Sequence, residues 1–390
     1  MNWGLLIASV MLITSCSAPT SLRHSFSSTG SIDPGEPTNP AGPIGPDPSP
    51  GPALDPGAPS EPVRLSPTPG KWVNVTSNLV GMTSECGNTP YVSAKPNEDL
   101  VIASVALQGL WGTKDGGSTW SRLGTNLGSA TITNRGGNIV YDPMAIGRFW
   151  QAGIYNGNGV YRTDDSGKSY VALGAVSHTD SVSVDLVDPN RMTLLAGAHE
   201  QKQKVYRSQD GGLTWINVGA NLPADSAFSS FPHVVDSKTF FAGCSPSWGG
   251  GVGGIFQSDD SGGTWHQISA KGGGNLPLVA HDGSIYWSSD DGSLVRGVGQ
   301  GMNWTFTQTV GPGTLRNVQP VELPDGRIVS LGAQNIMISS DQGVTWKAFG
   351  PPLPFQPVGI TYSKYDQSFY IWQFDCGDRV LPNAIMKLWM

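Results

Sequence analysis

Residues 208–215 read Ser-Gln-Asp-Gly-Gly-Leu-Thr-Trp, and the same pattern recurs along the chain. In this eight-residue pattern, called the box below, Ser or Thr stands two positions before Asp, and Gly stands two positions after it. Four more full copies and one degenerate copy without its Asp are present, at 113–120, 163–170, 258–265, 339–346 and, for the degenerate copy, 297–304. Successive boxes begin 39 to 50 residues apart, so the repeat has a period of about 45 residues.

The chemistry of the box predicts a tight hairpin turn. An Asp side chain can accept hydrogen bonds from backbone amides two residues on, and Gly tolerates a positive φ. The flanking runs, such as 159–162 before a box and 215–218 after one, alternate apolar and polar residues as strands do. The aromatic residue is expected to begin the next strand and to pack under the turn. We therefore assign a structural role to the box carboxylates, Asp115, Asp165, Asp210, Asp260 and Asp341.

One hairpin in every 45 residues predicts an all-β fold with one four-stranded antiparallel blade per repeat, which is a β-propeller. Three further strand candidates follow the last box, at 358–362, 368–372 and 384–388. Their blade lacks an outer strand, and residues 71–75 resemble the strands that follow a box. The N-terminal strand is therefore expected to complete the last blade and to close a ring of seven.

The composition excludes several other classes. The chain contains 52 Gly and 30 Pro among 390 residues, and only 14% of its residues are charged. Helical bundles and coiled coils need long Gly-poor helices, and nucleic-acid-binding modules need a dense basic face. The formal net charge of −7 gives no reason to expect a nucleic-acid partner.

The N-terminal residues predict export. Residues 4–14 are apolar but too short to span a bilayer. They lead into Leu-Ile-Thr-Ser-Cys, which resembles the lipobox of bacterial lipoproteins with Cys16 as the lipidated residue. Because no Lys or Arg precedes the apolar run, a secretory signal cleaved near Ser17 is the alternative. Both alternatives predict an extracytoplasmic protein.

The next segment differs sharply in composition. Residues 31–70 contain 13 prolines and no aromatic residue, which predicts an extended tether rather than a packed domain. The predicted organisation is a signal peptide with lipobox at 1–16, a tether at 17–70 and the propeller at 71–390.

The box resembles the Asp-box (BNR) repeat of sialidases, xyloglucanase-type glycoside hydrolases, sortilin-type receptors and a photosystem assembly factor. The resemblance covers about 320 residues and implies that the boxes are scaffold. Sialidases carry an arginine triad and an Arg-Ile-Pro segment. This chain has no such segment and its arginines are few, so sialidase activity is not expected. Xyloglucanase-type enzymes join two seven-bladed propellers, whereas this chain has room for one.

In such a propeller, Cys86 falls in the loop before the first blade and Cys376 in a loop of the seventh. These two loop types share one face and the two blades are neighbours, so we predict a disulfide between them. The alternative is that the three cysteines of the propeller are all reduced. Cys244 is expected to be a small core residue.

The same face is expected to carry any functional site. Its polar and aromatic loop residues are Glu85, His178, Asp180, His199, Glu200, Asp225, Trp248, Arg316, Asp375, Asp378 and Arg379. Two carboxylates can act as the acid and the base or nucleophile of glycoside hydrolysis. The catalytic candidates are Glu85, Asp180 and Asp375; the ligand-binding candidates are His178, Trp248, Arg316, Asp378 and Arg379. The alternative interpretation is that these are solvated loop charges.

Two other histidines, His233 and His281, are expected near inner strands as hydrogen-bonded core groups. No zinc or calcium motif is present in the sequence, so neither a metal nor a cofactor is expected.

The predicted function is therefore a glycan- or protein-binding module on the cell surface. It is expected to be a monomer that is held at the membrane by its lipid. The alternative is a carbohydrate-active enzyme, a glycoside hydrolase or polysaccharide lyase. An enzyme should gather two or more acids in a cleft with aromatic walls, whereas a binding scaffold should show scattered charge or an apolar patch.

Overall fold

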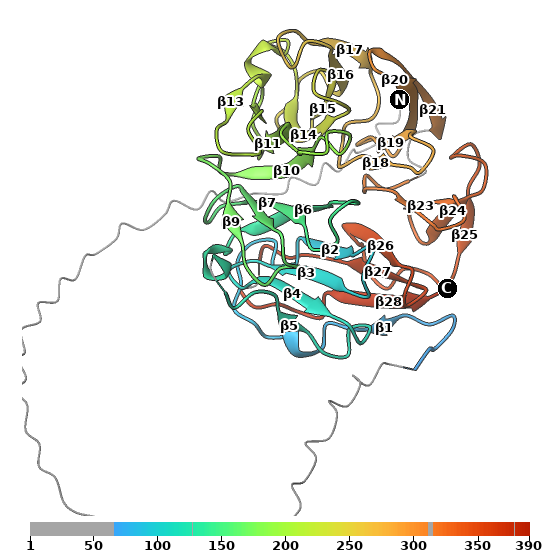
Figure 1. Ribbon diagram of the computed structural model, residues 1–390. Coiled ribbons are helices and arrows are strands. Elements are labelled where there is room, and N and C mark those ends of the chain that lie inside the picture. The colour runs from blue at the N-terminus through green and yellow to red at the C-terminus, as the bar shows by residue number, and fades with distance from the viewer. Residues whose placement is uncertain (1–65, 127, 311–314, 378) are drawn as a thin grey trace, which may run out of the picture. The chain divides into compact units, whose positions relative to one another are not determined.

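The structure is a computed structural model that describes residues 66–126, 128–310, 315–377 and 379–390. Seven four-stranded antiparallel sheets surround a central axis (Figure 1). The predicted all-β, seven-bladed propeller is confirmed. The predicted signal peptide, lipobox and most of the tether lie outside the described residues. Helix in the described part of the chain is limited to short 3-10 turns, and none is long and apolar enough to cross a membrane.

The first four blades follow one another along the chain, each running from its innermost to its outermost strand. Blade 1 contains β2 (Tyr91–Ala94), β3 (Val101–Val105), β4 (Gly109–Thr113) and β5 (Ser121–Arg122). Blade 2 contains β6 (Arg135–Tyr141), β7 (Phe149–Ile154), β8 (Val160–Thr163) and β9 (Val171–Ala172). Blade 3 contains β10 (Thr179–Val184), β11 (Leu194–Ala198), β12 (Val205–Ser208) and β13 (Ile216–Asn217). Blade 4 contains β14 (Phe228–Val234), β15 (Phe240–Ser245), β16 (Gly254–Ser258) and β17 (His266–Ser269).

The remaining blades continue this order until the last, which uses both ends of the domain. Blade 5 contains β18 (Leu278–Val279), β19 (Ile285–Ser288), β20 (Leu294–Gln300) and β21 (Asn303–Val310). Blade 6 contains β22 (Val321–Glu322), β23 (Ile328–Leu331), β24 (Ile336–Ser339) and β25 (Lys347–Phe349). Blade 7 contains β26 (Gly359–Ser363), β27 (Ser368–Trp372), β28 (Ile385–Trp389) and β1 (Val73–Asn74). The 3-10 turns are η1 (Ser77–Leu79), η2 (Ser129–Thr131) and η3 (Gly219–Asn221).

The N-terminal strand closes the ring, as predicted. β1 pairs antiparallel with β28, with Val73 opposite Lys387 and Asn74 opposite Met386. Figure 1 shows this N-terminal strand beside the red C-terminal strand. The hydroxyl of Thr76 accepts hydrogen bonds from the amides of Ala384 and Ile385, both at 2.9 Å, so the contact continues beyond the strand.

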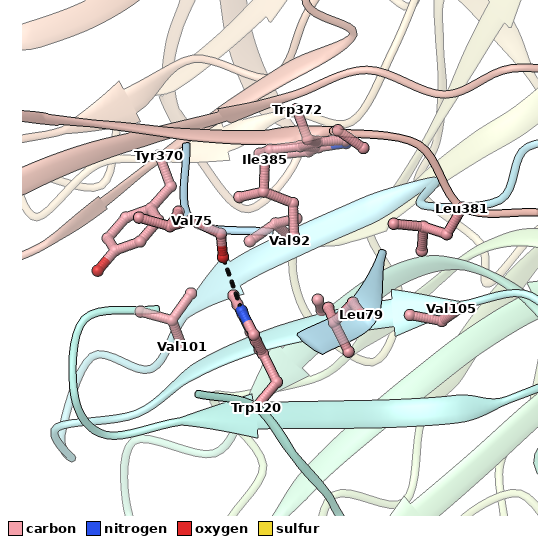
Figure 2. Packing of buried hydrophobic residues seen from close by; sticks show 12 residues of the cluster. Val75, Leu79, Val92, Val101, Val105, Trp120, Tyr370, Trp372, Leu381 and Ile385 are labelled. Carbon is pink, nitrogen blue, oxygen red and sulfur yellow. Dashed lines mark hydrogen bonds between the residues drawn. The ribbon is translucent and has the colours of Figure 1, made fainter. Parts of the chain in front are cut away.

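The hydrophobic core is divided among the blade interfaces. One buried cluster lies between each pair of neighbouring blades, seven in all around the described ring. Figure 2 shows the cluster between blades 7 and 1, where Val75, Trp120, Tyr370 and Ile385 converge. Each sheet thus buries both of its faces against its neighbours, which explains why the second strands β3, β11 and β15 are buried at every position.

The box turns share one set of hydrogen bonds. In the first box the Thr113 hydroxyl donates to Asp115 Oδ1 at 2.7 Å and accepts from the Gly117 amide at 2.9 Å. Asp115 Oδ1 also accepts from the amide of Thr119 at 3.0 Å. The other four full boxes repeat these bonds. The Asp therefore binds an amide four residues on, and the sequence-based expectation of two residues was wrong.

The box tryptophan precedes the outer strand and packs against the preceding blade, rather than beginning the strand as predicted. Trp120 Nε1 donates to the carbonyl of Val75 at 2.8 Å, the bond drawn in Figure 2. Trp215 and Trp265 make the equivalent bonds to Leu173 and Val218. Each acceptor directly follows the outer strand of the preceding blade, so these indoles tie neighbouring blades together.

The degenerate box forms a different turn. β20 and β21 pair as far as Gln300 opposite Asn303, so only two residues, Gly301 and Met302, join the strands. Because no Asp is available to organise a longer turn, the two strands continue as a hairpin. The predicted disulfide between Cys86 and Cys376 is present, and Cys244 is a buried free thiol, as expected.

Candidate functional site

Two loops of each blade form what we call the upper face: the loop before the innermost strand and the loop joining the second and third strands. They end on the same side because antiparallel strands alternate in direction. The lower face carries the other two connections, including the box turns. The predicted site residues on the upper face are Glu85, His178, Asp180, His199, Glu200, Asp225, Trp248, Arg316, Asp375 and Arg379. Asp378 lies outside the described residues.

Several hollows lie where the innermost strands and their loops meet around the axis, and two of them reach the predicted site residues. The larger has a volume of about 490 Å3 and contains Tyr91, Gln319 and Leu276 in its wall. The Tyr91 hydroxyl donates to Gln319 Oε1 at 3.2 Å and so joins blades 1 and 6, which are not neighbours. A smaller pocket of about 120 Å3 shares Leu276 and is lined by Arg135 and Asp180.

A group of polar and aromatic residues extends from this smaller pocket, and two of its members, Arg135 and Asp180, line the pocket. We call this group the blade 1–3 cluster, and it consists of Glu85, Arg135, Tyr155, Asn156, Asp180 and His199. Glu85 lies in the loop before β2, and Arg135 is the first residue of β6. Three loops of blades 1, 2 and 3, together with the starts of β6 and β10, therefore place these side chains together, although they are separated by up to 114 positions in the sequence.

The cluster contains a histidine held by carboxylates. His199 Nδ1 lies 2.8 Å from Asp180 Oδ1, and His199 Nε2 lies 3.8 Å from a carboxylate oxygen of Glu200. Burial opposes the charged imidazolium, but the hydrogen bond and charge of Asp180, with a smaller contribution from Glu200, raise the pKa of His199. The imidazole is therefore available as a proton donor or as a cationic binding group.

The backbone around this histidine is strained. Tyr155, His178 and Glu200 have φ angles of 70°, 53° and 48°, in the left-handed region that residues other than Gly rarely adopt. Tyr155 contacts the rings of His199 and His178 edge-on, with centroid distances of 5.7 and 6.3 Å. Positive φ angles also occur in the box turns, for example at Ser166, so here they explain only how the side chains are placed. The result is an aromatic surface beside charged groups.

Glu85 lies on the other side of the cluster. Its Oε1 accepts a hydrogen bond from Asn156 Nδ2 at 2.8 Å. Burial raises the pKa of Glu85, while the Asn156 hydrogen bond and the charges of Arg379 and Arg135 act in the opposite direction. Glu85 and Asp180 thus have unlike surroundings, since one is bound by a neutral amide and the other by an imidazole.

Trp248 forms a second aromatic surface on the same face. It is 69% exposed and contacts Phe228 edge-on, with a centroid distance of 5.1 Å. A side chain on Gly249 would collide with the ring of Phe228, so this glycine permits the close approach. An exposed indole supported from below is suited to stacking on a flat, weakly polar ligand surface.

Two other predicted candidates make hydrogen bonds to backbone atoms of loops in their own blades. Arg316 donates through Nε and Nη2 to the carbonyls of Gly332 and Ala333, at 2.9 and 2.7 Å. Asp375 Oδ1 accepts from the amide of Gly377 at 2.6 Å and orders its own turn. The structure does not join these two residues to the blade 1–3 cluster by a hydrogen bond.

The two additional histidines behave differently from each other. His233 lies in β14, as expected of a core group; it stacks on Phe241, and burial lowers its pKa to about 4. The expectation for His281 was wrong. Its side chain is 74% exposed in the turn between β18 and β19 on the lower face, where it pairs with the carboxylate of Glu322. A short strand followed by a tight turn carries it out of the core.

Sequence reasoning missed Arg135, Tyr155 and Asn156. Each occupies a loop or strand position equivalent to one that was singled out in another blade. Arg135, for example, lies at the start of β6, just as His178 and Asp180 lie at the start of β10. Aligning the blades by the positions of their boxes would have identified these three residues. Within the described ranges, no group of three or more His, Cys, Asp and Glu side chains is placed to hold a metal ion.

No family model matches the chain. A xyloglucanase from Paenibacillus sp. is 27% identical over 226 residues, which cover 52% of this chain and 19% of that protein. The xyloglucanase Xgh74A of Acetivibrio thermocellus is 25% identical over 224 residues, covering 52% of this chain and 24% of that protein. The chain thus spans less than a quarter of the length of these curated relatives.

Solved structures show similarity over more of the chain. A GH74 xyloglucanase from Xanthomonas campestris has a TM-score of 0.52 at 17% identity, covering 82% of this chain and 53% of that one. A GH74 enzyme from Niastella koreensis has a TM-score of 0.55 at 16% identity, with coverages of 79% and 53%. YCF48 bound to a D1 peptide has a TM-score of 0.50 at 14% identity, with coverages of 84% and 97%. These similarities show the propeller fold.

Proposed function

We propose that this protein is an exported, lipid-anchored propeller that binds a glycan on its upper face. In this proposal residues 1–16 are the signal peptide with Cys16 as the lipidated residue, residues 17–70 are the tether, and residues 71–390 are the binding domain. The boxes are Asp-box (BNR) repeats and serve as scaffold. The disulfide supports an extracytoplasmic location, because disulfides persist in oxidising compartments.

The observation that carries this proposal is the blade 1–3 cluster itself. It combines hydrogen-bonded carboxylates, an imidazole and the strained aromatic residue Tyr155 beside a pocket at the ring axis. Carbohydrate recognition needs such a combination, because sugars present hydroxyl groups at their edges and weakly polar C–H surfaces on their faces. Trp248 supplies a further exposed ring on the same face.

The curated relatives favour a glycan over a protein ligand, since both are xyloglucanases. A peptide ligand has its own structural parallel in YCF48, which was solved with a D1 peptide. The larger hollow at the axis has a mixed wall that contains both polar residues, such as Arg316, and apolar residues, such as Trp372. The blade 1–3 cluster, by contrast, offers hydrogen-bonding side chains at a small pocket, and these polar groups support the glycan.

The second candidate function is glycan cleavage, and one observation favours it. Glu85 and Asp180 are two acids of one cluster whose surroundings differ, and burial raises the pKa of Glu85. Unlike environments of two carboxyl groups are how hydrolases assign the roles of acid and base. In this reading Glu85 is the proton donor and Asp180 acts with His199.

A polysaccharide screen that records both binding and the release of reducing ends tests the proposal. We expect retention on at least one plant or bacterial cell-wall polysaccharide, and a loss of affinity of about tenfold for Tyr155→Ala, the size of one lost sugar-stacking contact. Val171→Ala, an exposed apolar residue on the outer strand β9, is the matched control and should bind normally. Absence of binding to every glycan contradicts the proposal. Release of reducing ends that Glu85→Gln abolishes favours the enzyme.

A further inference from the structure

We propose that Arg135 recognises an anionic group, and that the glycan bound at the upper face carries carboxylates, as uronic acid residues do. This inference rests on the proposed glycan-binding function and specifies its ligand class. It follows from the way in which the guanidinium group is held and from what its neighbours already bind.

The guanidinium of Arg135 lies between two surfaces. On one side it packs against the backbone of Gly87, where a side chain at residue 87 would overlap it. On the other side its Cζ lies 4.7 Å from the centroid of the Phe374 ring. A cation held over an aromatic face and against a glycine is fixed in position before any ligand arrives.

The disulfide holds both of these surfaces. Gly87 directly follows Cys86, and Phe374 precedes Cys376 by two residues. The amide of Gly87 also donates to the carbonyl of Asp375 at 3.0 Å, which reinforces the same contact between the loops of blades 1 and 7. The disulfide therefore orders the two surfaces that hold Arg135, which is a residue of blade 2.

In the described part of the chain, no group accepts a hydrogen bond from the Arg135 side chain and no carboxylate lies within ion-pair distance of it. The nearby charges are already bound, because Glu85 accepts from Asn156 and Asp180 contacts His199. The charge of Glu85 acts on Arg135 from a distance, but it forms no hydrogen bond or ion pair with the guanidinium. The N–H groups of Arg135 are therefore available to a ligand carboxylate, which can add a charge-assisted hydrogen bond.

The shape of the site suits a carboxylate on a sugar. A guanidinium presents parallel N–H groups that match the two oxygens of a carboxylate. Arg135 and Asp180 line the pocket of about 120 Å3, which accommodates a small substituent rather than a whole ring. The exposed ring of Tyr155 contacts His199, which in turn binds Asp180 at the pocket wall, and this ring is available to the sugar that bears the substituent.

The test compares polysaccharides that differ only in charge. Polygalacturonate, alginate and glucuronoxylan are each presented to the full chain beside their methyl-esterified forms, and affinity is measured by calorimetry at constant ionic strength. We expect at least one free acid to bind about tenfold more tightly than its ester, the order of one charge-assisted bidentate contact. Arg135→Gln should remove this preference and leave binding of the ester unchanged, while Arg135→Lys should retain part of it.

The controls separate recognition from folding. Arg122→Gln changes an exposed arginine on the outer strand β5 and should retain the full preference. Thermal unfolding of each Arg135 variant shows whether it folds, and unchanged affinity for the ester gives an independent check. If acid and ester bind equally, or if Arg135→Gln keeps the preference, the inference is overturned and glycan binding stands. Tighter binding of a sulfated galactan than of any uronate overturns the carboxylate assignment. If no charged or neutral glycan binds, the proposed function itself fails.

Discussion

At the scale of single residues, the most informative group is His199. Its two ring nitrogens face the carboxylates of Asp180 and Glu200, and Arg135 is the nearby positive charge that opposes its protonation. The ring of Tyr155 contacts the imidazole edge-on, and the His199 amide donates to the carbonyl of His178. The net result is a raised pKa, so the protonated imidazolium stabilises the folded state.

This arrangement predicts a pH-dependent stability. Because the folded pKa of His199 is raised, its contribution is fully present below the unfolded value of about 6.5 and is lost as pH rises through the folded value. Asp180→Asn should therefore lower the free energy of unfolding more at pH 5.5 than at pH 8.5. Urea unfolding at the two pH values measures this, with Asp225→Asn, an exposed acid on the same face, as the control. Equal costs at both pH values would contradict the assignment.

At the scale of the element, the box does more than turn the chain. The bonds from Asp115 order the turn itself, whereas the indole of Trp120 reaches the preceding blade. Trp346 has a different role, because its Nε1 donates to Gly343 within its own turn. Identical motifs therefore contribute differently to the ring, depending on what lies beside them.

This difference predicts unequal effects of the same substitution. Trp120→Phe removes the donor to the buried Val75 carbonyl and should lower the free energy of unfolding by about 1–3 kcal/mol, the cost of an unsatisfied buried acceptor. Trp346→Phe loses only a bond within its turn and should cost no more than about 1 kcal/mol. Denaturant unfolding of the two variants provides the measurement. Equal losses would show that the contact between blades is not the important one.

At the scale of the whole molecule, the ring is closed by its two ends and by one covalent link. β1 completes blade 7, and the Cys86–Cys376 disulfide joins blades 7 and 1 on the upper face. Val75 and Leu79, which follow β1, are fully buried in the cluster between these blades. Closure therefore uses strand pairing, side-chain burial and a cross-link at the same seam.

Truncation separates the tether from the ring. A chain beginning at residue 71 should leave the membrane fraction in which the full chain is found, yet unfold at the same temperature. A chain beginning at residue 77 loses Val75 and the hydroxyl of Thr76, and we expect its free energy of unfolding to fall by about 3–5 kcal/mol. Calorimetry and membrane fractionation measure the two effects. Equal stability of both truncated chains would contradict closure by the N-terminal strand.

Much of the fold was predictable because its information is local and repeated. The box spacing predicted the blade count, and the shortage of a strand after residue 346 predicted closure by residues 71–75. The pairing of Cys86 with Cys376 followed from the same register. The details of the turn were less predictable: whether Asp binds an amide two or four residues on depends on how the Gly residues bend the chain between them.

The site was predictable only in outline. Loop positions placed Glu85, Asp180 and His199 on one face, but nothing in the sequence showed that Asp180 would contact His199 or that Asn156 would bind Glu85. Periodic local patterns determined the architecture by themselves, because hydrogen bonds within each turn and strand pairs within each blade are short-range. Only the tertiary structure decided which side chains meet at the axis. Their separation depends on how seven blades pack around the ring, and that packing belongs to no single repeat.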